Sequence, residues 1–230
     1  MRIVFVRHGD PDYEQDCLTE SGKKQAKALA QRLKNEGIEE IWASPMGRAM
    51  QTASAVSEVL DLPINKLEFM REVTWGSTDG SELFSDGHPW NIADEMARRG
   101  INLNNEDWRN DDFFKTNRVV ENVDMIEKEL DAWLESFGYV RDGFYYDHKV
   151  SEDTHKTIAL FSHGGSSAAA MGHILNLPFP YMCALFHMEF TGINIIRFDK
   201  NSGKGTLPRL ELANDGKHIR DEKYVCPDRK

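Results

Sequence analysis

Short apolar runs alternate with amphipathic segments along this chain, and this alternation limits the available folds more than any other feature. Residues 3–6 (IVFV) are continuous and β-branched, which predicts a buried strand. Thr19 then offers an N-cap to a segment in which Ala26, Leu29 and Leu33 recur at helical spacing. Strands that alternate with helices form a mostly parallel sheet covered on both faces. We therefore predict an α/β fold, a three-layer α/β/α sandwich.

The same rhythm predicts the other elements of the sandwich. Each is a short apolar run or an amphipathic segment bounded by Gly, Pro or Ser. The final strand is expected at an edge of the sheet because it contains Pro208. We predict strands at residues 39–44, 67–70, 157–162, 192–198 and 205–212, and helices at residues 46–60 and 166–175.

Residues 73–150 interrupt this rhythm. They hold Gly-, Ser- and Asp-rich turns, an acidic and aromatic run, and one amphipathic helix. We predict that residues 1–230 form a single domain in which residues 73–150 are a cap-like insertion over the ligand-binding edge of the sheet. His88, Trp90 and Trp108 of this insertion are candidates for contacts to a ligand, and a purely structural role is the alternative for each.

Charge and cysteine content exclude several classes of protein. The net charge of −10 argues against a nucleic-acid or anionic-membrane partner, since both require basic surfaces. No apolar run approaches the roughly 20 residues of a membrane-spanning helix. A strand that begins at Ile3 leaves no room for a signal peptide. Three widely separated Cys residues are typical of reduced thiols, so we expect a cytoplasmic protein.

Polar residues follow four of the predicted strands at the point where each strand ends. The carboxyl ends of parallel strands lie at one edge of a sheet, and ligands bind beyond that edge. We therefore expect these side chains to converge. They are Arg7, His8 and Gly9 after the first strand, Ser44 and Arg48 after the second, Arg71 and Glu72 after the third, and Ser162, His163 and Gly164 after the strand at 157–162.

This set of side chains favours phosphoryl transfer. Arg7 and Arg48 present planar forks that match phosphate oxygens, and the helix that opens after Gly164 adds backbone N–H groups. A neutral imidazole such as His8 can attack phosphorus, and neighbouring Arg charges keep it neutral. Glu72 can protonate the leaving oxygen and later accept a proton from water. Because cationic side chains replace Mg²⁺ here, we expect no metal and no cofactor.

Four motifs occur in the order found in a known family: VRHGD, SPMGRAMQTA, MREVTWG and SHGG. Together they resemble the histidine phosphatase superfamily, the phosphoglycerate-mutase-like fold, over residues 1–76 and 157–200. The resemblance implies that Arg7, Arg48 and His163 bind phosphate, with His8 as the phosphorylated nucleophile. It also implies that Glu72 is the proton donor and that the substrate is a small phosphorylated metabolite, a phosphomonoester.

Departures from the family pattern favour a phosphatase over a phosphoglycerate-type phosphomutase. Asp10 stands where the family usually has Glu or Gln, and residues 10–18 lack the Asn-containing stretch that helps to hold phosphate in the mutases and in many phosphatase branches. The long basic insertion of the glycolytic mutases is also missing. Because a mutase must retain its phosphohistidine, these lost contacts favour hydrolysis.

Two other classes of function remain as alternatives. The run GGSSA is a near miss to the G-x-S-x-G elbow of serine hydrolases, with Ser166 as nucleophile and Asp199 and His218 following in triad order. That interpretation leaves the Arg-His pair near the N-terminus unexplained. A non-catalytic phosphate-binding module is the other alternative, but it has no need of His8 and Glu72.

Overall fold

The computed structural model describes residues 1–149, 155–199 and 205–220. Its main sheet has six strands in the order β10-β9-β1-β8-β4-β5. β1, β8, β4 and β5 run parallel, and β9 is antiparallel to both of its neighbours. The mostly parallel sheet is therefore confirmed. The strands are β1 (Arg2–Arg7), β4 (Glu40–Ala43), β5 (Ile64–Lys66), β8 (Thr157–Ser162), β9 (Ile193–Arg197) and β10 (Arg209–Asp215).

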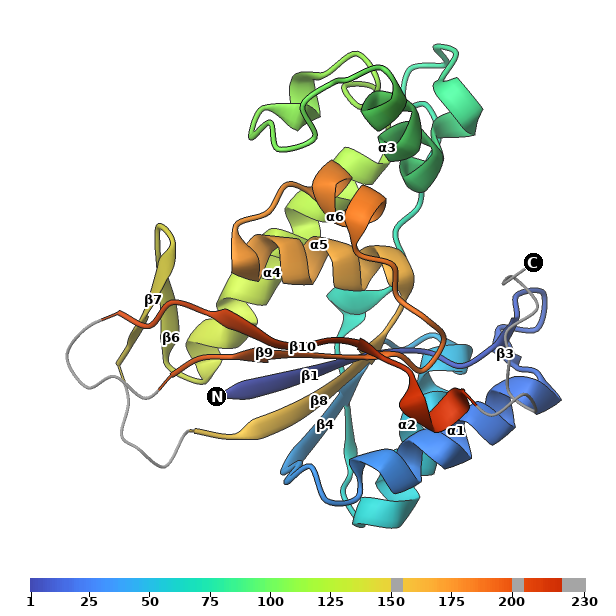
Figure 1. Ribbon diagram of the computed structural model, residues 1–230, viewed down its shortest axis with the longest axis vertical. Helices are drawn as coiled ribbons and strands as arrows, with labels where there is room; N and C mark the ends of the chain where they lie inside the picture. Colours follow the sequence, from blue (N-terminus) through green and yellow to red (C-terminus); the bar gives the residue numbers. More distant parts are fainter. Residues whose placement is uncertain (150–154, 200–204, 221–230) are drawn as a thin grey trace.

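Helices cover both faces of this sheet, which confirms the three-layer sandwich (Figure 1). Alternate residues of β1 face the two layers. Val4 and Val6 belong to the core beneath α1 (Glu20–Leu33) and α2 (Gly47–Leu60). Ile3 and Phe5 belong to the core on the opposite face. That face carries α4 (Val119–Ser136), α5 (Gly164–Leu175) and α6 (Phe179–Leu185).

The start of α1 is fixed closely against the loop that follows β1. Thr19 caps the helix, as predicted, because its Oγ1 accepts a hydrogen bond from the N–H of Gly22 at 3.0 Å. A Cβ at Gly22 would lie 2.2 Å from the carbonyl oxygen of Asp10, so only glycine permits this approach. The Asp10 N–H also donates to Gln25 Oε1 at 2.7 Å. The backbone just beyond His8 is therefore held rigidly by α1.

One predicted strand is wrong. Residues 67–70 do not form a strand: β5 ends at Lys66, and a 3-10 helix, η1 (Glu68–Met70), follows. The reason is that β4 ends at Ala43, opposite Lys66 in the ladder. After the bond from the Leu67 N–H to the Ala43 carbonyl, β4 offers no further strand to pair with.

Residues 73–150 contribute to the molecule in two ways. The first part holds two 3-10 helices, η2 (Phe84–Gly87) and η3 (Trp108–Asn110), and α3 (Pro89–Arg98), which packs on α6 beyond the helical layer (Figure 1). The second part begins with α4, which lies within that layer. A hairpin that the sequence did not predict follows α4. Its strands are β6 (Tyr139–Asp142) and β7 (Tyr145–His148).

Three smaller features complete the described chain. A short ribbon of β2 (Pro11–Asp12) and β3 (Cys17–Leu18) lies between β1 and α1. The 3-10 helix η5 (Lys217–Ile219) follows β10. β10 lies at the edge of the main sheet, as predicted, and Pro208 directly precedes it.

Candidate active site

The ends of β1, β8 and β4 bring His8, His163 and Ser44 together. Arg71, which was expected to converge with them, instead pairs with Glu68 at 3.1 Å and has a side chain that is 55% exposed. Arg7 and Ser162 are partners at the last position of the β1–β8 ladder, so His8 and His163 both follow directly. The His8 N–H donates to the Ser162 carbonyl at 2.9 Å, and the two imidazole rings lie 5.1 Å apart between centroids. Ser44, just after β4, lies 2.8 Å from His163 through its hydroxyl oxygen.

His8 is buried and oriented by its own neighbour. Its Nδ1 lies 2.7 Å from the Gly9 carbonyl oxygen, which can only accept, so Nδ1 carries the hydrogen and donates it. The lone pair is therefore on Nε2, and Arg48 Nε approaches that atom at 3.3 Å. Burial, followed by the charges of Arg7 and Arg48, lowers the pKa of His8 to about 3. His8 is thus a neutral imidazole whose Nε2 is its nucleophilic atom.

Arg48 lies in the first turn of α2, and only 5% of the residue is exposed. Its Nη1 forms an ion pair with Asp16 Oδ1 at 2.6 Å. The other carboxylate oxygen of Asp16 accepts a hydrogen bond from the Gly47 N–H at 2.7 Å. Thr52 links the same turn to the loop after β1, since its hydroxyl accepts from the Gly9 N–H and donates to the Arg48 carbonyl. Asp16 was not among the residues predicted from the sequence.

Arg7 lies on the other side of the site and is held by two contacts. Its Nη1 donates to the Met188 carbonyl at 2.7 Å, and its guanidinium lies 4.1 Å from the centre of the Phe190 ring. Its Nε is buried and has no hydrogen-bond partner among the described residues. A buried, unsatisfied donor beside a neutral histidine is suited to an anionic ligand.

His163 is fully buried and presents one nitrogen to the same region. The Ser44 hydroxyl accepts from the Met46 N–H at 3.4 Å and lies 2.8 Å from His163 Nε2. A hydroxyl can accept and donate at once, and we assign its own hydrogen to the bond with Nε2. Nδ1 of His163 then carries a hydrogen, and it has no partner among the described residues. Burial, followed by the neighbouring His8 and Arg48, lowers the pKa of His163, so this donor is also neutral.

Glu72 lies against the first turn of α5. Its Oε1 accepts hydrogen bonds from the N–H groups of Val73, Gly165 and Ser166, at 3.0, 2.9 and 3.1 Å. Burial raises the pKa of Glu72 in spite of these bonds. Because Oε1 accepts three hydrogens, a proton on this carboxyl group belongs on Oε2. A Cβ at Gly165 would lie 2.3 Å from Val73 Cγ2 and 2.8 Å from Glu72 Oε1, so glycine is required there.

A cavity of about 310 Å³ borders the Arg7 and Glu72 side of this site. Arg7, Glu72 and Gly164 form part of its lining. Of the three ligand-contact candidates from residues 73–150, His88 and Trp90 line the cavity, whereas Trp108 is buried against Phe114 and Phe179. The other lining residues are Tyr13, Trp75, Phe186, His187 and Met188.

Ser166, Asp199 and His218, the triad of the serine-hydrolase alternative, are not hydrogen-bonded to one another in this structure. Ser166 is buried, and its hydroxyl accepts from the His163 N–H at 3.4 Å. Asp199 pairs with Arg197 at 2.9 Å, and His218 lies 3.0 Å from the Thr191 hydroxyl. Neither of the two proposed partners is hydrogen-bonded to Ser166.

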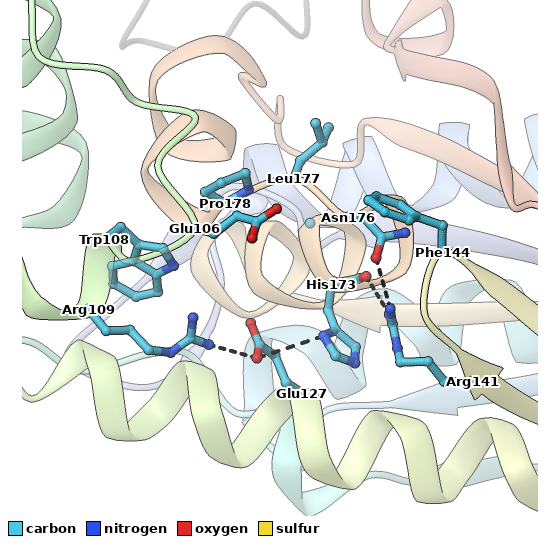
Figure 2. A pocket seen from close by; sticks show the side chains of 11 residues that line it. Glu106, Trp108, Arg109, Glu127, Arg141, Phe144, His173, Asn176, Leu177 and Pro178 are labelled. Carbon is cyan, nitrogen blue, oxygen red and sulfur yellow. Dashed lines mark hydrogen bonds and ion pairs between the residues drawn. The ribbon is translucent and has the colours of Figure 1, made fainter.

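A second cavity, of about 190 Å³, lies at the other end of α5 (Figure 2). His173, ten residues after His163, lies about 15 Å farther along the helix axis. Two of its charged groups, Arg109 and Glu127, form an ion pair at 2.7 Å, and Arg141 donates a hydrogen bond to the Asn176 side chain at 3.0 Å. This polar cavity lies away from the candidate site.

Two further observations concern metals and membranes. Over residues 1–149, 155–199 and 205–220, no group of three or more His, Cys, Asp or Glu side chains is arranged to hold a metal ion. Metal independence stays a prediction, which the effect of a chelator on the wild-type rate would test. No helix in these same ranges combines the length and apolar character needed to cross a membrane.

Comparison with known proteins identifies the family. The model of the histidine phosphatase superfamily (branch 1) matches residues 3–210, so this chain belongs to that superfamily, as its motifs predicted. One relative is "Probable phosphoglycerate mutase GpmB" of Proteus mirabilis (strain HI4320), 22% identical over 234 residues that cover 96% of each chain.

Two solved structures share the fold. A mycobacterial glucosyl-3-phosphoglycerate phosphatase matches with a TM-score of 0.62 and 24% identity, over 93% of this chain and 98% of its own. A phosphoserine phosphatase from Entamoeba histolytica, in complex with 3-phosphoglyceric acid, matches with a TM-score of 0.61 and 21% identity, over 94% and 98%.

Proposed function

We propose that this protein is a metal-independent phosphomonoesterase that forms a covalent phosphohistidine on His8. The observation that carries the proposal is the state of His8: a buried, neutral imidazole whose Nε2 lone pair faces Arg48 and whose pKa is lowered by burial and by the charges of Arg7 and Arg48. The substrate class is a small phosphorylated metabolite, with neither nucleic acid nor membrane as partner. The similarity to structures named glucosyl-3-phosphoglycerate phosphatase and phosphoserine phosphatase supports this proposal.

The first step transfers the phosphoryl group to the enzyme. The phosphate oxygens bind between Arg7, Arg48 and the Nδ1–H of His163, which together neutralise their charge without a metal. Arg48 Nε shifts from His8 Nε2 to a phosphate oxygen, which frees the lone pair. His8 Nε2 then forms a bond to phosphorus as the bond from phosphorus to the leaving oxygen breaks. Glu72 donates the Oε2 proton to that oxygen, so the product leaves as a neutral alcohol.

The second step returns the phosphoryl group to water. Glu72, now a carboxylate, accepts a proton from the attacking water. The water oxygen bonds to phosphorus and the P–N bond breaks, which restores His8 and releases inorganic phosphate. A phosphomutase would pass the group to a second substrate hydroxyl instead. Incubation with 3-phosphoglycerate and 2,3-bisphosphoglycerate separates the two: phosphate release supports a phosphatase, whereas net formation of 2-phosphoglycerate supports a mutase.

The proposal extends to the setting of the enzyme. The segment around α3 acts as a cap, because His88 and Trp90 from this segment line the cavity above the phosphate groups. Among the described residues, Cys17 and Cys183 are free thiols, which supports a cytoplasmic location, whereas Cys226 lies outside the described residues.

Trapping the intermediate tests the proposed chemistry. Rapid alkaline quench with ³²P-labelled substrate should place the label on His8, because a phosphoramidate survives base and is lost in acid. The His8→Ala variant should take up no label. Label on Ser166 would instead establish the serine-hydrolase alternative, and binding without label or turnover would establish a phosphate-binding module.

A further inference from the structure

The walls of the cavity above the phosphate site are unusual because they combine aromatic side chains with few charges. From their placement we infer that the enzyme prefers phosphomonoesters whose leaving group carries an uncharged aromatic ring and discriminates against leaving groups that carry a carboxylate. This inference rests on the phosphatase function proposed above and names the substrate class of that same site.

One wall is a continuous aromatic surface from residues 75–90. The ring of His88 lies 4.8 Å from that of Trp75 and 5.4 Å from that of Trp90. Trp90 also packs near Gly164, at the start of α5 and beside the phosphate-binding groups. Trp75 is 38% exposed, although it is one of the largest apolar side chains in the chain. An exposed Trp at the rim of a cavity offers a flat face on which a ring can stack.

Two other segments extend this aromatic lining. Tyr13, in the turn between β2 and β3, is 65% exposed and lies edge-on to His8 with ring centroids 6.5 Å apart. Phe186 enters the lining from the end of α6. Aromatic rings therefore reach the leaving-group side of the phosphate site from three separate parts of the chain.

The charged groups that line the cavity do not offer a cation to a second anionic group of the substrate. Among the cavity-lining residues that the structure describes, the ionisable groups besides Tyr13 and His88 are Arg7, Glu72 and His187. Arg7 belongs to the phosphate site and is bound to a backbone carbonyl. Glu72 repels a second anion whenever it is ionised. The side chain of His187 is 74% exposed and lies 3.6 Å from Glu189.

The imidazole of His88 does not supply a positive charge to the cavity. Burial lowers the pKa of His88, so its ring is neutral near pH 7, and its Nδ1 has no hydrogen-bond partner among the described residues. A carboxylate placed here would lose water without gaining a fixed cation, which is costly. An aromatic ring would lose only unfavourable hydration and gain stacking contacts.

Two matched pairs of substrates separate these effects in the full-length protein. 2-Phenylethyl phosphate and ethyl phosphate differ by a ring, and both release a poor alkoxide leaving group. Glycerol 3-phosphate and 3-phosphoglycerate differ by the carboxylate. We expect the ring to raise kcat/KM by roughly 2- to 13-fold, from stacking worth about 0.5–1.5 kcal/mol. We expect the carboxylate to lower kcat/KM by about tenfold or more, as burial of an unpaired charge requires.

Three variants assign the ring preference to the cavity wall. Trp75→Ala should lower the ratio of kcat/KM between the two substrates of the ring pair by about twofold or more, because one of the stacking faces is lost, whereas Trp75→Phe should retain most of the ratio. Phe144→Ala is the matched control, because Phe144 is an exposed aromatic residue on the distant β6–β7 turn. The ratio in that variant should equal the wild-type ratio.

The possible results distinguish this inference from the function on which it rests. The inference about substrate preference is overturned if kcat/KM is equal for the ring pair, or if the enzyme prefers 3-phosphoglycerate to glycerol 3-phosphate. Release of phosphate from these substrates would still support the phosphatase function. In the His8→Ala variant, calorimetry should find tighter binding of 2-phenylethyl phosphate than of ethyl phosphate. Equal binding there also refutes a ring-binding wall, whatever the turnover. Absence of turnover and of His8 label with all four substrates overturns the phosphatase proposal itself.

Discussion

Replacement of Glu72 by Gln isolates one proton in the proposed mechanism. Oε1 of Glu72 accepts three backbone N–H groups, and the amide oxygen of Gln can accept the same three. The variant should therefore keep the side chain and the start of α5 in place. What it removes is the acidic proton on Oε2, because an amide does not donate a proton to a departing alkoxide.

The expected loss depends on the leaving group. Ethyl phosphate releases a strongly basic alkoxide, so Glu72→Gln should lower its kcat/KM by roughly 10²- to 10⁴-fold, the usual contribution of general acid catalysis. 4-Nitrophenyl phosphate releases a stable phenolate without protonation, so its loss should be much smaller. The ratio of the two losses measures the contribution of the proton, since kcat/KM reports the first transition state.

The pH dependence of the wild-type enzyme provides an independent check. Burial raises the pKa of Glu72, which extends the protonated, active form of the acid to higher pH. The kcat/KM for ethyl phosphate should therefore hold below that raised pKa and fall as pH rises through it, and Glu72→Gln should lose this limb. Equal losses on both substrates would refute the assignment of Glu72 as the acid. Asp10, the carboxylate nearest to the nucleophile in sequence, would then be the next candidate.

Three further changes test the rest of the site. His8→Ala should abolish hydrolysis of 4-nitrophenyl phosphate, while EDTA should leave the wild-type rate unchanged; a large loss with EDTA would indicate a metal mechanism. Asp16→Asn removes a negative charge beside Arg48 and so removes its repulsion of a bound phosphate. Two unit charges about 4 Å apart in water repel by roughly 1 kcal/mol, so the Ki of inorganic phosphate should fall about fivefold. An unchanged Ki would contradict a phosphate site at Arg48. Gly165→Ala should lower Tm by roughly 2–12 °C through overpacking against Val73, whereas Gly164→Ala, whose Cβ would meet nothing closer than 3.4 Å, should keep the wild-type Tm.

The convergence of His8 and His163 was predictable because it depends only on strand order and direction. Each residue follows an apolar, β-branched strand, and two parallel strands end at the same edge of a sheet. Glu72 lies at the site as predicted, although residues 67–70 before it form a 3-10 helix and not the predicted strand. The 3-10 helix η1 carries the chain past the end of β4, and residues 71–73 then pass beside the start of α5.

The supporting contacts of the two arginines had no sequence signal. Arg7 is held by the backbone carbonyl of Met188, 181 positions away, and a carbonyl is the same in every residue. Asp16 belongs to a loop with no periodic pattern, and only the folded loop shows that it faces Arg48. Such contacts are set by tertiary packing, which a single sequence does not encode in local spacing.

The contact between Arg48 Nε and His8 Nε2 has a consequence for chemical selectivity. An electrophile that reaches this histidine meets a lone pair already engaged by a cation at 3.3 Å. Only a group with enough negative charge to attract the guanidinium to itself releases the lone pair at the moment of attack. Arg48 therefore keeps the proposed nucleophile engaged until a phosphate dianion binds the guanidinium. A neutral alkylating or acylating agent does not attract the guanidinium, so it should react slowly with His8 Nε2.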